Sequence, residues 1–254
     1  MGTLHCLQVG CADASVIITT TATFLVDCAN IDAHSSLLPK SKILRGVFIT
    51  HQHDDHYSGL NYLKQKDYSI DYLVYSPYSR RYNDQSVTLE EWNEFKSLKE
   101  HFEKKGTETR SPYRQDAFDK PWWSTNGLKF WMIGPDKAAA TSNTREIHDA
   151  SLVIKADLGE RYCCFAGDAS DTCLEQIADN TKDYCNDILH ASHHGSLNGA
   201  YLDFIKKAQA KYTVISTETG VYDNVPHPTA LRRYKDHTAE KVYRTDDGSI
   251  KWTF

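Results

Sequence analysis

The sequence predicts an α/β protein in which helices pack on the outside of a β-sheet. Three observations lead to this prediction. Short β-branched and apolar runs recur along the 254 residues, segments with helical spacing alternate with them, and histidines and aspartates gather directly after several of the runs. The hydrophobic fraction of 40% is enough for a sizeable core, so we expect residues 1–254 to form a single domain.

The first 76 residues alternate between strands and helices. Residues 15–28 are β-branched and apolar around a polar centre, which predicts a hairpin. Strands are expected over residues 43–50 and 71–76, and the helical spacing of residues 57–65 places a helix between them. This order is typical of a sheet with helices packed against it.

The middle of the chain has a different character, and we expect residues 77–127 to form an insert or a lid. Within it, a helix over residues 88–105 begins with a capping box of Thr88 and Glu91. One face of this helix carries apolar residues at helical spacing: Leu89, Trp92, Phe95, Leu98 and Phe102. This apolar stripe is expected either to pack in the core or to dock a protein partner.

Strands return after residue 127. They are expected over residues 128–134, 151–158, 161–168, 187–192, 212–217 and 249–254, with helices over 171–179, 199–209 and 228–235. Because Cys163 and Cys164 alternate across one strand, one of them is expected to face the core. The seven cysteines follow no paired spacing, which is typical of reduced, mostly buried thiols in a cytosolic protein.

The bulk composition narrows the classes of function. No apolar run approaches the ~20 residues that span a bilayer, and the N-terminus lacks the basic start and cleavage site of a signal peptide. We therefore expect a cytoplasmic protein with no membrane contact. The net charge of -5 is unlike that of most nucleic-acid binders, although bound metal ions would add positive charge that this count omits.

The stretch HQHDDH, residues 51–56, carries the strongest indication of chemistry. His51 and His53 follow a strand with their side chains on one face, where two imidazoles can share a cation. Asp55 and His56 come next, where the chain turns into a helix, and can face a second cation. Imidazole and carboxylate ligands together suit zinc, with manganese and iron as alternatives. The stretch therefore predicts half of a hydrolytic site with two divalent metal ions.

The remaining ligands are expected at the ends of later strands. Asp168 follows a strand and a glycine, where its carboxylate could bridge two cations, although a helix N-cap explains the position equally well. One of His193 and His194 is expected to bind metal; His194 is preferred, and the other would face the substrate or support the site. His148 is the preferred third imidazole at the first metal, with Asp149 as the alternative.

Further groups are expected to contact a substrate. His227 stands between two prolines before a helix, where it could donate a proton to a leaving group or serve as a structural turn residue. Ser196 and the amides after His194 could contact a phosphate. Arg80 and Arg81, beside tyrosines in SPYSRRYND, could bind a nucleic-acid backbone, or the segment could be a solvated loop.

Together these motifs resemble those of the metallo-β-lactamase fold superfamily. Its H-x-H-x-D-H signature matches His51, His53, Asp55 and His56, TFLVDCA matches a strand ending in the aspartate Asp27, and FAGDAS matches a bridging aspartate at Asp168. Within the superfamily the sequence is most similar to ComEC-type domains. That likeness depends on LQVGCADASVII with Asp13, on HASHHGS, on HPT and on VYRTDDGSIKWTF, which resembles a terminal hairpin.

The resemblance implies a four-layer αββα sandwich with a partly helical insert. It implies that Asp27 supports the metal loop and that Asp13 lies near the site. It also implies a hydrolase that uses a hydroxide activated by two metal ions, oriented by Asp55, with a phosphodiesterase or nuclease acting on DNA or another nucleic acid as the leading hypothesis. A hydrolase of small esters, lactones or phosphoesters and a partner-regulated effector subunit are the alternatives.

Overall fold

Two mixed β-sheets of seven strands each lie face to face in the computed structural model, which describes residues 1–254. The first sheet contains, in spatial order, β14 (Ile250–Thr253), β1 (Thr3–Cys6), β2 (Ala14–Ile18), β3 (Thr23–Cys28), β4 (Ile43–Ile49), β5 (Ser69–Tyr75) and β6 (Glu108–Arg110). The second contains β13 (Lys241–Arg244), β12 (Tyr212–Ile215), β11 (Ile188–His190), β10 (Tyr162–Phe165), β9 (Val153–Asp157), β8 (Leu128–Gly134) and β7 (Trp123–Thr125).

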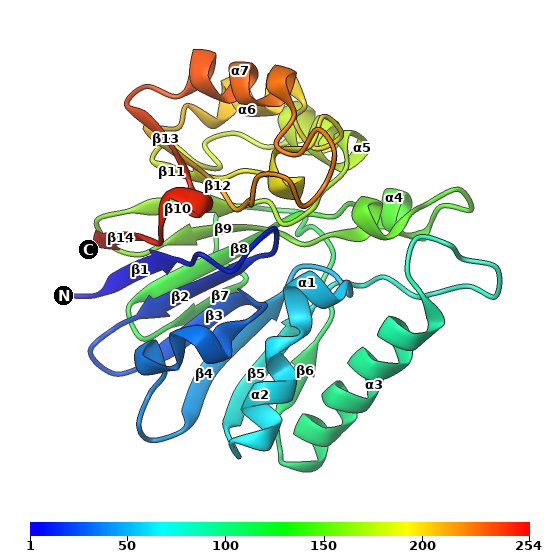
Figure 1. The fold of residues 1–254 in the computed structure, drawn as a ribbon, viewed down its shortest axis with the longest axis vertical. Helices are drawn as coiled ribbons and strands as arrows, with labels where there is room; N and C mark the ends of the chain where they lie inside the picture. Colours follow the sequence, from blue (N-terminus) through cyan, green and yellow to red (C-terminus); the bar gives the residue numbers. More distant parts are fainter.

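Helices cover the outer face of each sheet (Figure 1). The first sheet is covered by α1 (Asp54–Tyr57), α2 (Gly59–Gln65), α3 (Leu89–Lys104) and a 3₁₀ helix, η1 (Ile31–Leu37). The second is covered by α5 (Asp171–Asn180), α6 (Leu202–Ala208) and α7 (Pro228–His237), while the short α4 (Lys137–Thr141) lies at its edge. The predicted αββα sandwich is confirmed.

The alternation of side chains along the strands produces three buried layers. Phe48 and Phe130 belong to the layer between the sheets, where their ring centroids lie 4.9 Å apart. Separate apolar layers lie under the helices of each sheet. Cys163 faces the layer between the sheets, and Cys164 faces the layer under the helices. Both thiols are therefore fully buried, whereas the sequence predicted a buried position for only one of them.

The two sheets share a strand arrangement that determines where loops can meet. Strands β3 to β6 pair in parallel in the first sheet, and β10 to β13 pair in parallel in the second. Parallel neighbours all end at the same edge, so the segments that follow β4, β10 and β11 can gather there.

The segment 77–127 is built into both sheets rather than lying over them as a lid. It supplies α3, then β6, which extends the first sheet, and β7, which pairs with β8 in the second. The capping box of Thr88 and Glu91 is confirmed at the start of α3.

The apolar stripe of α3 is used within the chain. Phe95, Leu98 and Phe102 are buried in the core under the first sheet, and Trp92 packs against Tyr78. The stripe is therefore not available to dock a partner, because only Leu89 remains exposed.

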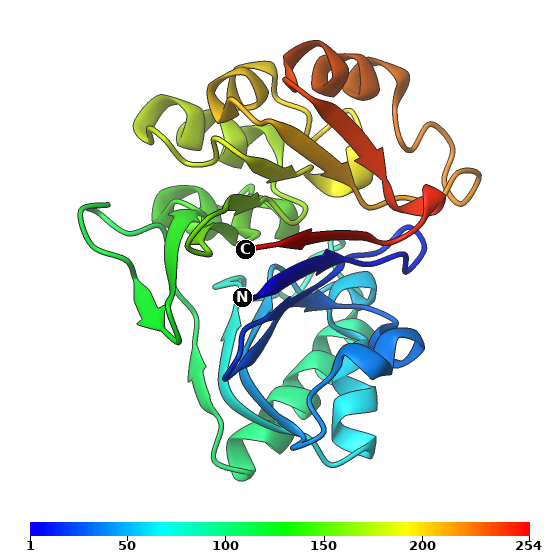
Figure 2. The same ribbon diagram turned by 90° about the vertical axis from the view of Figure 1, so that its left-hand side faces the viewer.

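Two local predictions differ from the structure. The helix expected over residues 57–65 consists of two short helices, α1 and α2, joined at Ser58. The prediction of a terminal hairpin is wrong. Strand β13 pairs in parallel with β12, whereas β14 crosses to the first sheet and pairs with β1. Figure 2 shows the two chain ends side by side as a result. None of the helices has the length and apolar composition that crossing a bilayer requires.

Candidate metal centre

Segments from both sheets bring the predicted ligands together at one edge of the sandwich. His51 to His56 follow β4, Asp168 follows β10, and His193 and His194 form the turn after β11. His148 lies in the 3₁₀ helix η2 (Ile147–Ala150), which precedes β9. All of them contribute ligand atoms to clusters whose members lie within 4.8 Å of one another.

One cluster consists of three imidazoles, His51, His53 and His148. His51 Nε2 lies 2.9 Å from His53 Nδ1, and the His148 ring centroid lies 5.3 Å and 5.1 Å from the centroids of those two rings. The structure thus places His148, rather than the alternative Asp149, with the H-x-H pair. Asp149 instead accepts a hydrogen bond from the Ser170 hydroxyl and one from the Glu146 amide.

A second cluster consists of Asp55, His56 and His194. The carboxylate of Asp55 lies 3.8 Å from His56 Nε2 and 3.5 Å from His194 Nε2. His56 and His194 are buried, and Asp55 is partly exposed at the rim. Of the two adjacent histidines, His194 therefore occupies this buried cluster.

Asp168 lies between the two clusters. Its Oδ2 is 3.8 Å from His51 Nε2 and 3.6 Å from His194 Nε2, and its Oδ1 is 3.3 Å from His56 Nε2. The alternative role of helix N-cap belongs to Ser170, whose hydroxyl accepts the Cys173 amide at the start of α5. The carboxylate of Asp168 faces both clusters, as a bridging ligand would.

For three of the imidazoles, hydrogen bonds select the nitrogen that turns toward the centre. His53 Nε2 donates to the Ser86 carbonyl at 2.6 Å, which leaves Nδ1 facing His51. His194 Nδ1 donates to the Ser216 carbonyl at 3.0 Å. His56 Nδ1 donates to Asp27 Oδ2 at 2.9 Å, so Nε2 of both rings points inward.

Asp27 holds the loop that follows β4, residues 50–56 (the metal loop), by three hydrogen bonds. Besides His56, its carboxylate accepts the Thr50 amide and the Thr50 hydroxyl, each at 2.7 Å. Asp13 lies behind the site, 3.6 Å from His194 Nδ1 and 3.8 Å from His190 Nδ1. The positions of both aspartates agree with those that the resemblance implied.

A turn that the sequence did not reveal supports His53. Asp84 Oδ1 accepts the Ser86 amide at 3.0 Å and the Ser86 hydroxyl at 2.7 Å, and the Tyr78 hydroxyl donates to the other oxygen of Asp84. The Ser86 hydroxyl accepts the Ile147 amide at 3.1 Å, one residue before His148. The turn thus connects two ligands of the first cluster, although 33 residues separate His53 from Ser86.

Five buried polar atoms at the centre make no hydrogen bond within the chain. They are Asp55 Oδ1, His56 Nε2, His148 Nε2, Asp168 Oδ1 and His194 Nε2. Leaving so many buried donors and acceptors unpaired is costly, whereas each of these atoms is a good ligand for a divalent cation. The donor set of five imidazoles with one bridging and one terminal carboxylate fits two cations of the zinc class.

The charged groups of the cluster act strongly on one another's pKa. Burial opposes protonation of His56, yet the carboxylates of Asp168, Asp27 and Asp55 raise its pKa well above the usual value. Burial likewise opposes protonation of His194, and Asp168 raises its pKa to about 9. Burial lowers the pKa of His148 to about 3. The neutral His148 and the carboxylates are already in the protonation states that metal binding requires.

Unusual backbone conformations place several of these side chains. His193 and His194 have φ of 52° and 51°, in the left-handed region that non-glycine residues seldom occupy. Before Asp168, Gly167 has φ of 50°, and a Cβ there would lie 2.5 Å from Thr50 Cβ. The turn that follows β10 and the metal loop can approach so closely only because residue 167 is a glycine.

The remaining predicted residues lie around the centre. His193 directs Nε2 to within 3.8 Å of Asp168 Oδ2, and its Nδ1 donates to the Asn198 carbonyl. The Ser196 hydroxyl donates to the same Asn198 carbonyl. His227 caps α7, with Nδ1 accepting the Thr229 amide at 3.1 Å, and it does not line the cavity at the centre. A proton-donor role for His227 stays a prediction.

A cavity of about 320 Å³ opens onto the centre. Its walls combine ligand side chains, His53, Asp55, His148, Asp168, His193 and His194, with two residues that the sequence did not single out, Tyr222 and Val225. A substrate can therefore reach Asp55 and Asp168 from solvent.

No protein-family model and no curated protein matches the sequence. Solved structures do match. The metallo-β-lactamase fold protein YhfI from Bacillus subtilis aligns with a TM-score of 0.57 and 14% identity over 99% of each chain. A diphosphatase from the PhnP family aligns with a TM-score of 0.54 and 15% identity, covering 100% of this chain and 98% of its own. Zn²⁺-bound PqqB from Methylobacterium extorquens gives a TM-score of 0.53 and 8% identity, with 95% and 87% of the chains covered.

The protein therefore has the metallo-β-lactamase fold. At that fold's strand ends it carries a buried cluster of histidines and aspartates suited to two metal ions. The ComEC-type likeness is not tested by these comparisons and stays a prediction.

Proposed function

We propose that this protein is a metal-dependent hydrolase of phosphodiesters, with nucleic acids or nucleotides as the leading substrate class. The observation that carries the proposal is the arrangement of two ligand clusters around Asp168 at the floor of an open cavity. His51, His53 and His148 would hold one cation, Asp55, His56 and His194 the other, and Asp168 both.

The residues have distinct roles in the proposed reaction. When bound, a pair of divalent cations supplies Lewis acidity and a nucleophilic water at neutral pH. Asp55, at the rim, has an unpaired Oδ1 that can accept a hydrogen bond from that water and orient it toward the substrate. Asp27 and Ser86 keep His56 and His53 oriented through the bonds described above.

Two considerations support a phosphodiester. A pair of cations complements a substrate that carries negative charge at the reacting atom. The similarity to a diphosphatase supports chemistry at phosphorus on the same fold. The modest volume of the cavity, about 320 Å³, favours a second candidate, a small ester, lactone or phosphoester, over a long duplex.

The metal-loaded protein can be assayed against single-stranded DNA, duplex DNA, RNA, a chromogenic phosphodiester and a panel of carboxylic esters. We expect hydrolysis of phosphodiesters, and we expect Asp168→Ala to abolish it and to lower the bound metal measured by elemental analysis. Asp119→Ala changes an exposed aspartate outside the site and is the matched control. Clear ester turnover with inert phosphodiesters would assign the second candidate instead.

A further inference from the structure

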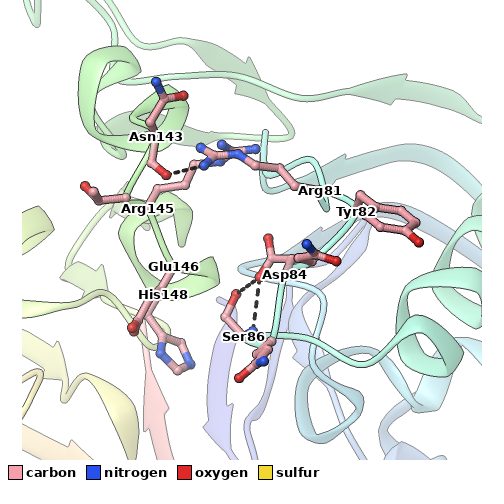
Figure 3. Close-up of a pocket in the computed structure, with 11 residues that line it drawn as sticks. Arg81, Tyr82, Asp84, Ser86, Asn143, Arg145, Glu146 and His148 are labelled. Atoms are coloured by element: carbon pink, nitrogen blue, oxygen red, sulfur yellow. Dashed lines mark hydrogen bonds between the residues drawn. The ribbon is translucent and has the colours of Figure 1, made fainter.

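A second and larger cavity, of about 650 Å³, adjoins the metal centre (Figure 3). His148 lines both cavities, so the two adjoin each other at this side chain. The second cavity lies between residues 81–86, which follow β5, and residues 143–148, which precede β9. A group attached to a phosphate at the centre can extend into it.

Arginine side chains connect the two walls of this cavity by hydrogen bonds. The guanidinium of Arg81 donates to the carbonyls of Ser142 and Asn143, and the bond to Asn143 is visible in Figure 3. Arg145 donates to the Ser142 carbonyl at 3.2 Å within its own wall. It also donates to the Ser79 carbonyl, which belongs to the segment of the opposite wall. Arg80 donates to three carbonyls of its own loop. These guanidinium groups are bonded to the backbone in part, and the expected contacts of Arg80 and Arg81 with a nucleic-acid backbone stay a prediction.

The groups that face solvent in the cavity include three amides and an aromatic ring, beside the exposed Glu146. Asn83, Gln85 and Asn143 are exposed, and none of their side chains hydrogen-bonds to the rest of the chain. A primary amide presents a donor beside an acceptor, which is the pattern that pairs with the edge of a nucleobase. Tyr82 has 94% of its surface exposed and offers a face on which a base can stack.

We propose that this cavity binds the nucleobase of a nucleotidyl phosphodiester whose phosphate lies at the metal centre. The inference rests on the proposed function. The cavity contributes affinity through stacking on Tyr82 and hydrogen bonds from the amides, whereas the bond cleaved lies outside it. It predicts that the enzyme discriminates between phosphodiesters by the presence of a base and not by the phosphate alone.

The test compares two substrates with the same leaving group, thymidine 5′-(4-nitrophenyl) phosphate and methyl 4-nitrophenyl phosphate. Tyr82→Ala and Asn143→Ala are each expected to lower kcat/KM about tenfold for the thymidine substrate, mainly through KM, and to leave the methyl substrate unchanged. Tyr162→Ala is the matched control, because this tyrosine is 42% exposed and lines neither cavity. Equal losses on both substrates, or no loss on either, would overturn the proposal.

Binding separates this inference from the proposed function. Calorimetry of the metal-loaded protein with thymidine 5′-monophosphate and with ribose 5-phosphate needs no turnover. Tighter binding of the nucleotide, reduced by Tyr82→Ala, would support the base site even if no phosphodiester were hydrolysed. Equal binding of the two ligands would exclude the base site even if phosphodiesterase activity were found.

Discussion

Three ligand histidines, His53, His56 and His194, are each oriented by a hydrogen bond from the ring nitrogen that faces away from the centre. For His56 the partner is a carboxylate, whereas for His53 and His194 it is a backbone carbonyl. Such outer partners fix the tautomer and raise the ligand's basicity, and their loss commonly lowers metal affinity about 10–100-fold. The carbonyl of Ser86 is held in place by Asp84, so Asp84 acts on the metal site without touching it.

Asp84→Ala should weaken one of the two metal sites. It removes the acceptor for the Ser86 amide and hydroxyl, which frees the carbonyl that orients His53. We expect about a tenfold loss of affinity for one ion and little change for the other, measured by competition with a chromophoric chelator. Asp84→Asn retains an acceptor oxygen and should lose less. Unchanged affinity for both ions in the alanine variant would show that the turn plays no part.

The metal-free protein should lose stability between about pH 6.5 and pH 9. Burial opposes the charge of His194, but Asp168 raises its pKa to about 9 in the folded chain, above the unfolded value of 6.5. A raised pKa contributes stability that is complete below the unfolded pKa and is lost as the pH rises through the folded pKa. Urea unfolding across this range should show a decrease on the order of 3 kcal/mol.

His194→Gln provides the control for that pH dependence, since glutamine does not titrate. Its unfolding free energy should fall less steeply over the same range. A decrease of the same size in the variant would assign the effect to another group.

At the scale of elements, the close approach of two strand ends builds the centre. The metal loop after β4 and the turn after β10 meet at Gly167, where a side chain would collide with Thr50. Asp168 reaches the histidines of the first sheet only because this contact is so short. The backbone conformation of His193 and His194 turns their rings from β11 to the same point.

Gly167→Ala should therefore be far more damaging than an ordinary substitution of a left-handed glycine. Gly159→Ala is the matched control: its φ is 94° and a Cβ there meets nothing within 4 Å. Both variants incur the left-handed strain, about 1–2 kcal/mol, and Gly167→Ala adds a clash of roughly 1–3 kcal/mol more. Urea unfolding gives the two losses, and bound metal should fall only in Gly167→Ala. Equal losses would contradict the role of this contact.

Elements with a long apolar pattern could be predicted from the sequence, and short or polar ones could not. The hairpin over residues 15–28 and the helix that begins after Thr88 have strong local signals. Strand β6, only Glu108–Arg110, is polar and forms because β5 offers a free edge. The last strand looked like half of a hairpin, because local sequence does not indicate which sheet a strand joins.

In the candidate site, too, residues with a local sequence signal could be predicted and those without one could not. The cluster at residues 51–56 and the aspartate after β10 follow apolar strands, so their chemistry was visible as a local pattern. The roles of Ser86 and Tyr222 depend on contacts with residues far away in the chain, for which the sequence holds no signal. His227 was ambiguous for a related reason, since capping and catalysis place a histidine at the same position before a helix.

Across the whole molecule, the proposed metal ions would connect the two sheets. His51, His53, Asp55 and His56 come from the first sheet's side, and Asp168 and His194 come from the second. The final strand also connects the halves, because it leaves the second sheet and pairs with β1, where Gly2 and Phe254 exchange backbone hydrogen bonds of 2.6 Å and 3.0 Å.

Removing the metal should therefore destabilise the whole fold and not just the loops. Each ion that binds only the folded chain stabilises it by about 4 kcal/mol when present at roughly 1,000 times Kd. For a chain of this size, the loss of one such ion corresponds to a decrease in Tm on the order of 10 °C after chelation, measured by scanning calorimetry. The double variant Asp168→Ala/His194→Ala lacks the shared carboxylate and one imidazole of the second cluster, so its Tm should respond much less to chelation than that of the parent. If chelation lowered the Tm of the variant as much as that of the parent, the ions would be bound elsewhere, and the connection between the sheets would have to come from packing alone.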